Sequence, residues 1–174
     1  MQPVATPEPP EVQDRLYRQL RIIARARLRN GGRNTLLDTS ALVHEAYLRM
    51  APAAAELDGE HQLLAYASRT MRSVIVDLAR RRQTERHGGQ AFRVTWTESA
   101  QPERLAVAAD EVVRVHEALA ELEELDPRLA KVVEMRYFGG LTDEQIAQAL
   151  GIGERTVRRD WDKARLLLEQ ALRA

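Results

Sequence analysis

The segment Leu141–Leu172, LTDEQIAQALGIGERTVRRDWDKARLLLEQAL, constrains the fold more than any other part of the chain. Thr142 can cap a helix, because Gln145 three residues later can reach back to it as in a capping box. Gly151 then supplies the left-handed residue that commonly ends a helix. Ile152 can pack in the angle between this helix and the next. The segment is therefore predicted to form two helices joined by a tight turn.

The second of these helices has an apolar side and a basic side. Val157, Trp161 and Ala164 recur at helical spacing and are expected to face inward. The outward-facing positions are then held by Arg155, Thr156, Arg158, Arg159 and Lys163. The N-terminal part of such a helix can enter a DNA major groove, with Arg158 and Lys163 mainly contacting bases and the other three contacting phosphates. An ordinary helical hairpin with a solvated arginine face is the alternative.

The composition of the whole chain is typical of a soluble globular protein. Of its 174 residues, 44% are hydrophobic and 30% are charged, which fits an apolar core and excludes a fibrous protein. The chain has no cysteine, so disulfides and thiolate metal sites are excluded. No apolar run approaches the ~20 residues of a membrane span, and the N-terminus lacks the pattern of a signal peptide. We therefore expect a cytoplasmic protein.

Breaks in the helical pattern predict an all-α fold of two small helical domains joined by a flexible linker, with the helix-turn-helix in the second domain. The expected divisions are a flexible leader at 1–11, a first domain at 12–82, a linker at 83–108 and a second domain at 109–174. In the first domain, Pro52 is expected to end the second helix. The third helix is expected to run from about Gly59 to Arg82. In the second domain, Asp126-Pro127 is expected to separate two helices.

Charge is segregated along the chain, although the formal net charge is zero. Seven arginines and no acid lie within Arg15–Arg33, and six arginines against two acids lie within Arg69–Arg86. Nine acids against two arginines lie within Glu98–Asp126. Each basic block fits either a solvated helix face or a surface for nucleic-acid phosphates. The acidic helix 110–126 can also pack against 15–33, or against the basic end of the third helix, and so close the two halves on each other.

Three stretches of the chain together resemble one family. Residues 125–165, LDPRLAKVVEMRYFGGLTDEQIAQALGIGERTVRRDWDKAR, resemble the minus 35 reading domain of bacterial sigma-70-type factors of the extracytoplasmic-function (ECF) group. Residues 36–50, LLDTSALVHEAYLRM, resemble the helix with which this group grips the clamp of RNA polymerase. Residues 64–82, LAYASRTMRSVIVDLARRR, resemble its minus 10 reading helix. The resemblance covers about 12–174 and implies a factor that guides core RNA polymerase to promoters.

The resemblance also implies roles for particular residues. It implies minus 10 contacts by Arg69, Arg72, Ser73, Arg80 and Arg81. Tyr66 either stacks on an unpaired base or belongs to the core. Polymerase contacts are implied for Asp38, Leu42, Val43, Glu45 and Tyr47. The expected partners are core polymerase, through its clamp and flap, promoter DNA, and an anti-sigma factor or a Ser/Thr kinase.

The sequence departs from the group's pattern at the start of the polymerase-binding helix. The acidic cluster Asp-Ala-Glu-Asp that is common in the group is replaced here by Asp38-Thr39-Ser40-Ala41. Charge complementarity with basic side chains of the clamp should therefore be weaker. Phosphorylation of Thr39 or Ser40 would restore about two negative charges at a helix N-terminus. Alternatively, both residues only cap the helix.

No pattern of residues indicates an enzyme, a cofactor or a metal site. His44-Glu45 is not followed by a second histidine at zinc-protease spacing, and His61, His87 and His116 lack acid or cysteine partners at ligand spacing. Two other functions remain open, a stand-alone helix-turn-helix regulator and an adaptor whose basic helices bind partners or RNA. A stand-alone regulator usually brings a ligand or receiver domain, whereas this chain brings a second basic helical domain.

Overall fold

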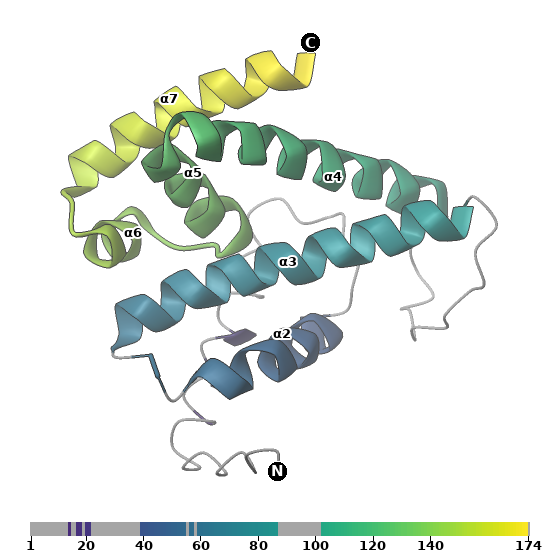
Figure 1. Ribbon diagram of the computed structural model, residues 1–174, viewed down its shortest axis with the longest axis horizontal. Helices are drawn as coiled ribbons and strands as arrows, with labels where there is room; N and C mark the ends of the chain where they lie inside the picture. The colour runs from purple at the N-terminus through teal and green to yellow at the C-terminus, as the bar shows by residue number, and fades with distance from the viewer. Residues whose placement is uncertain are drawn as a thin grey trace.

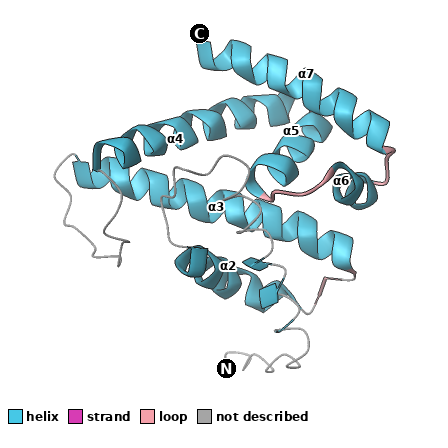
Figure 2. Ribbon diagram, turned by 180° about the vertical axis from the view of Figure 1, so that it is seen from behind, coloured by secondary structure: helices cyan, strands magenta, loops and turns pink. Residues whose placement is uncertain are grey.

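The computed structural model describes residues 39–54, 56–57, 59–86 and 102–173, together with residues 14, 17, 18, 20 and 21. All regular secondary structure in these residues is helical (Figure 2), so the all-α fold is confirmed. The described residues 14, 17, 18, 20 and 21 are helical. The predicted leader 1–11 and residues 87–101 of the predicted linker lie outside the described residues.

Two helices make up the first half of the described chain. Helix α2 (Thr39–Ala54) packs along one side of α3 (Glu60–Arg86) (Figure 1). The apolar side of α2 is fully used in this contact, since Val43, Ala46 and Met50 are buried in the core. Burial of this stripe holds α2 in place, because a helix of this length gains most of its stability from tertiary packing.

Pro52 lies inside α2, so the prediction that it ends the helix was wrong. A proline removes one backbone donor and crowds the carbonyl of the residue four positions earlier, which here is Leu48. Pro52 falls in the last turn of α2, which ends at Ala54. Only one helical hydrogen bond is lost there, and no further turn has to bend around the ring.

The second half contains α4 (Pro102–Leu125), α5 (Pro127–Val133), the π-helical turn η1 (Glu134–Phe138), α6 (Asp143–Leu150) and α7 (Glu154–Arg173). The predicted break at Asp126 is confirmed, because its carboxylate caps α5 by accepting a hydrogen bond from the Leu129 amide at 3.3 Å. The predicted linker is helical at both its ends, since α3 continues to Arg86 and α4 begins at Pro102.

The turn η1 was not predicted, because the sequence indicated one regular helix as far as Phe138. The amide of Gly139 donates to the carbonyl of Glu134, five residues earlier, at 3.1 Å. A Cβ added to Gly139 would collide with the Oγ of Ser68 on α3 and with the carbonyl oxygen of Met135. The backbone that follows η1 therefore presses directly on α3, and only glycine fits there.

The two halves of the described chain share one core. Helix α3 contacts α2 on one side and α4, η1 and α6 on the other, as both views show (Figures 1 and 2). One cluster of buried apolar side chains includes Met50 and Met71 from the first half and Phe138 and Ile146 from the second. The division of the chain into two domains stays a prediction.

Gly139→Ala is expected to lower the free energy of unfolding by about 1–3 kcal/mol, because the added methyl group overpacks the contact between η1 and α3. Urea unfolding followed by circular dichroism measures this change. Gly153→Ala is the matched control, since nothing lies within 4 Å of the corresponding Cβ position. Its cost should stay below ~1 kcal/mol, the loss expected for a weaker helix cap. Equal destabilisation by the two variants would contradict the close contact at Gly139.

Candidate nucleic-acid interface

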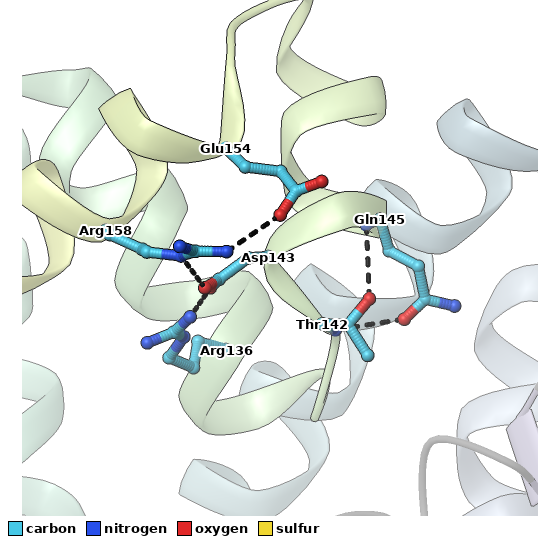
Figure 3. Close-up of polar contacts among 6 residues, drawn as sticks. All are labelled: Arg136, Thr142, Asp143, Gln145, Glu154 and Arg158. Atoms are coloured by element: carbon cyan, nitrogen blue, oxygen red, sulfur yellow. Dashed lines mark hydrogen bonds and ion pairs between the residues drawn. The ribbon is translucent and has the colours of Figure 1, made fainter.

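The turn between α6 and α7 has the local geometry that the sequence predicted. The Oγ1 of Thr142 accepts a hydrogen bond from the Gln145 amide at 3.2 Å, and the Gln145 Oε1 accepts one from the Thr142 amide at 3.0 Å (Figure 3). Gly151 follows α6 with a left-handed φ of 65°. The predicted capping box and glycine turn are therefore confirmed.

The inner side of α7 carries a buried acid that the sequence interpretation missed. Asp160 is 2% exposed and lies between Val157 and Ala164, both of which are fully buried. Its carboxylate accepts hydrogen bonds from Arg128 on α5 at 2.7 and 3.3 Å. The signal was available, because Asp160 falls on the apolar side of α7, where a carboxylate needs a partner. This ion pair fixes the orientation of α7 on α5.

The outer side of α7 is basic. Arg155, Arg158, Arg159 and Lys163 are exposed, and Thr156 is half-buried. Arg159 lies 3.6 Å from Asp160, and Lys163 lies 3.7 Å from Asp126. The side chains of Arg159 and Lys163 are themselves 72% and 62% exposed, so both cations remain available to an anionic partner.

Arg158 is held by two carboxylates near the start of α7 (Figure 3). Its Nε lies 3.1 Å from Asp143 and its Nη2 lies 3.0 Å from Glu154. Asp143 also pairs with Arg136, whose guanidinium lies 4.8 Å from the centre of the Trp161 ring. Burial lowers the pKa of Arg136 from its ordinary value. The sequence interpretation missed this cluster, in which Asp143 and Glu154 engage the Arg158 side chain.

Helix α3 carries a basic row, formed by Arg69, Arg72 and Arg80, which faces the second half of the chain. Arg69, Arg72, Ser73 and Arg80 line a cavity of about 660 Å³ whose opposite wall comes from α4, α5, η1 and α6. Arg81 is exposed and lies outside this lining. Tyr66 lines the cavity and also packs against the core, so both of its predicted roles fit.

Arg72 is buried, with 9% of its surface exposed. Its Nη1 lies 2.9 Å from Glu134 and 3.5 Å from Glu123, and its Nε donates to Nδ1 of His116 at 3.1 Å. In this structure Arg72 cannot contact DNA, because its guanidinium is committed to the second half. Arg72 thereby links His116 to two carboxylates, one on the same helix α4 and one on η1.

A family model for ECF sigma factors matches residues 10–174. The chain belongs to the ECF sigma factor family. Members of this family are transcription initiation factors that direct RNA polymerase to promoters and act on polymerase in the cytoplasm. Core RNA polymerase and promoter DNA are therefore the partners of this sigma factor. No curated protein and no solved structure matches the chain.

The residues of this sigma factor that were assigned to polymerase binding differ in exposure. Leu42 and Val43 are 8% and 1% exposed, so their side chains cannot touch polymerase in this structure, because α2 uses its apolar side to cover α3. Glu45 and Tyr47 are half-buried. Asp38 lies outside the described residues, and Thr39 and Ser40 begin α2.

Arg49 of the sigma factor joins α2 to α3. Its Nη1 donates to Asp77 at 2.6 Å and to Ser73 at 2.9 Å, and its Nε donates to Glu45 at 3.1 Å. Burial alone would lower the pKa of Arg49, but the hydrogen bonds to Asp77 and Glu45 outweigh it and raise the pKa above its ordinary value. Arg49 therefore stays charged and holds Ser73, one of the residues assigned to the minus 10 element.

The described residues of the sigma factor contain neither a membrane-spanning helix nor a metal-binding cluster. None of its helices combines the length and apolar character that crossing a bilayer requires. Within the same residues, His, Asp and Glu side chains form no group of three that could hold a metal ion.

Acidification is expected to destabilise the sigma factor through His116. Burial first, and then the positive charges of Arg72 and Arg80, lower the pKa of His116 below its ordinary value of 6.5, against smaller opposite effects of Glu117 and Asp77. As the pH falls below ~6.5, the unfolded chain takes up a proton before the folded chain does. The stability associated with a neutral His116 is therefore complete above that pH and is lost as the pH falls toward the folded pKa.

Urea unfolding between pH ~7.5 and ~5.5 measures this loss. His116→Gln keeps an acceptor for Arg72 but does not titrate, so its stability should depend less on pH than that of the wild type. The exposed His61 provides the control, and His61→Gln should keep the wild-type dependence. An identical pH dependence in His116→Gln and the wild type would contradict this assignment.

Proposed function

We propose that this ECF sigma factor recognises promoters with two separate surfaces, the outer side of α7 for the minus 35 element and the basic row of α3 for the minus 10 element. The observation that carries the proposal is the outer side of α7, where Arg155, Arg159 and Lys163 are exposed directly after a helix-turn-helix bend. A helix that is joined to its neighbour in this way can enter a major groove with its N-terminal part.

The contacts of α7 divide into two kinds. Arg155, Arg159 and Thr156 contact phosphates, which position the helix but carry no sequence information. Arg158 and Lys163 contact base edges, where an arginine can make two hydrogen bonds to one guanine. The pairing of Asp160 with Arg128 supports this role, because a reading helix has to be held rigidly to present its side chains.

The basic row of α3 captures the minus 10 element. Arg69 and Arg80 are eleven positions apart, which is about three helical turns, so they extend from the same side of α3. Cations on one side of a helix bind a phosphate backbone without regard to sequence. Tyr66 on the same side offers a ring on which an unpaired base can stack.

The polymerase clamp binds the surface of α2 that faces away from α3. Leu48 supports this assignment, because its surface is 55% exposed and the core does not use it. Glu45 and Tyr47 lie within three positions of Leu48 and are partly exposed. An apolar residue beside an acid and an aromatic ring is suited to a basic partner surface.

Phosphorylation of Thr39 or Ser40 strengthens this polymerase contact. The first turn of α2 contains no acidic residue, so a phosphate would add negative charge at a helix N-terminus, where it is favoured. A Ser/Thr kinase is then an activating partner, and an anti-sigma factor is a restraining one.

Thr39→Glu and Ser40→Glu are expected to increase the amount of core polymerase that the immobilised sigma factor retains, because each restores one carboxylate. Pull-down at several salt concentrations measures this, and the gain should shrink as salt rises. Thr84→Glu, on the exposed side of α3, is the control for a carboxylate added elsewhere. Unchanged or weaker retention by both α2 variants would exclude the switch and leave the two residues as helix caps.

Arg158→Ala is expected to weaken recognition of the minus 35 element by ~1–3 kcal/mol, while polymerase binding is retained. Run-off transcription with core polymerase measures it on paired templates, one with the upstream element and one with that element scrambled. Arg165→Ala, on an exposed position further along α7, is the matched control and should behave as the wild type. Loss of polymerase binding in Arg158→Ala would show that α7 had been assigned to the wrong partner.

The proposed function as a whole is tested by run-off transcription from a library of genomic fragments. The sigma factor should produce specific transcripts only when core polymerase is added. A stand-alone regulator would instead bind duplex DNA tightly as a pure protein. Absence of any transcript above the level of core polymerase alone would refute the proposal.

A further inference from the structure

The surface of α3 that is assigned to the minus 10 element faces the second half of the same chain, where Arg72 is buried while Arg69, Ser73 and Arg80 stay exposed. Of the five residues assigned to this element, Arg69, Arg72, Ser73 and Arg80 line the cavity between the halves. Across the cavity lie side chains of α4, α5, η1 and α6, namely His116, Glu123, Lys131, Glu134, Met135, Ala149 and Leu150.

We propose that this arrangement is an autoinhibited state, in which α4 and η1, here called the cover, bury Arg72 on the DNA-reading side of α3 until polymerase or DNA displaces them. The inference rests on the proposed function, because it takes α3 to be the minus 10 reading helix. It adds that the free sigma factor holds this helix closed with its own second half.

In the closed form Arg72 binds the carboxylates of Glu134 and Glu123, whereas in the open form it would bind DNA phosphates. Glu134 and Glu123 lie 2.9 and 3.5 Å from the Arg72 guanidinium, and the side chain of Glu134 is only 14% exposed. An arginine binds carboxylates and phosphates with the same donors. While these acids are in place, a phosphate that approaches Arg72 meets two negative charges, and the Nε and Nη1 donors of Arg72 are already engaged.

The cover also fits α3 by shape. The backbone at Gly139 touches Ser68 of α3 so closely that no side chain can stand between them. Met135 is buried beside this contact, and Ser68 itself is completely buried. A surface that met α3 only through long charged side chains would leave a gap here, so this face of the second half is built to close on α3.

The same interface is suited to opening. Charged groups that are buried on closure regain their hydration on opening, so a buried ion pair adds little net stability compared with apolar contacts. Arg72, Glu134 and Glu123 make the position of the cover specific without making it permanent. A partner that binds the open form only has to outweigh the remaining apolar contact.

Two substitutions open the cover from opposite sides without altering a residue assigned to DNA or polymerase. Glu134→Gln removes the charge that faces Arg72 at nearly constant side-chain size. Ser68→Gln places a longer side chain against Gly139, and in the open form this side chain is simply solvated on α3. Glu124→Gln and Thr84→Gln are matched controls at exposed positions on α4 and α3.

The separation of the halves is measured in the full chain by energy transfer between two dyes. The chain has no cysteine of its own, so His61→Cys on α3 and Arg165→Cys on α7, both exposed, direct the dyes to these two sites. Transfer efficiency should fall in Glu134→Gln and Ser68→Gln and stay at the wild-type level in the controls. In run-off transcription, the same two variants should reach half-maximal activity at a several-fold lower concentration, because a larger fraction is already open.

Energy transfer tests whether the halves are closed, and transcription tests whether closure inhibits the sigma factor. Unchanged transfer efficiency in both variants would overturn the closed cover. Lower efficiency without any gain in transcription would overturn the inhibition. If neither the wild type nor the variants produce transcripts with polymerase, the proposed function has failed, and the energy transfer in the protein alone still decides whether the halves are closed.

Discussion

The buried guanidinium of Arg72 is the constraint on which the arrangement of the two halves depends. An arginine withdrawn from water costs several kcal/mol unless charged and hydrogen-bonding partners surround it. Glu123 and His116 of α4 and Glu134 of η1 supply these partners, and each has to lie within hydrogen-bonding distance of one side chain on α3. The position of α4 and η1 over α3 follows from this requirement, and the apolar contact around Gly139 adds the net stability.

The two proposed DNA-reading surfaces differ in how accessible they are when the two halves are closed. The outer side of α7 is exposed and keeps Arg155, Arg159 and Lys163 available. The row on α3 faces the other half, with Arg72 committed to internal partners. In the proposed mechanism the phosphate-contacting arginines of α7 are therefore accessible in the free protein, although Arg158 first has to leave Asp143 and Glu154. On α3, Arg72 becomes available only after the halves separate. This order fits a factor that should open promoter DNA only when polymerase is present.

Local signals in the sequence predicted the local geometry well. The capping box of Thr142 and Gln145, the left-handed Gly151 and the break at Asp126-Pro127 each depend on residues a few positions apart, and all three are confirmed. The features that were missed depend on partners distant in sequence. The Asp160 pair joins residues 32 positions apart, and the contact of Arg72 with Glu134 spans 62. Helical periodicity shows that a position faces inward but not which helix it will meet.

Two errors had local causes that periodicity could not reveal. Pro52 was taken as a stop because proline breaks helix interiors, whereas the last turn of α2 tolerates it. The π-helical turn η1 keeps nearly the same apolar pattern as a regular helix, and its wider turn shows only in the hydrogen bond from Gly139 to Glu134.

The roles of Leu42 and Val43 could not be separated by sequence from those of Glu45 and Tyr47, because all four belong to one helix and only packing decides which are exposed.

In the proposed mechanism the halves are closed in the free sigma factor and separate on binding polymerase. Spin labels on cysteines introduced at His61 and Arg165, both exposed, allow the distance between α3 and α7 to be measured by double electron–electron resonance. The distance is measured first in the free chain and then in the complex with core polymerase. One narrow distribution of short distances is expected in the free chain, with a shift to longer distances in the complex. The same distribution in both states would contradict it.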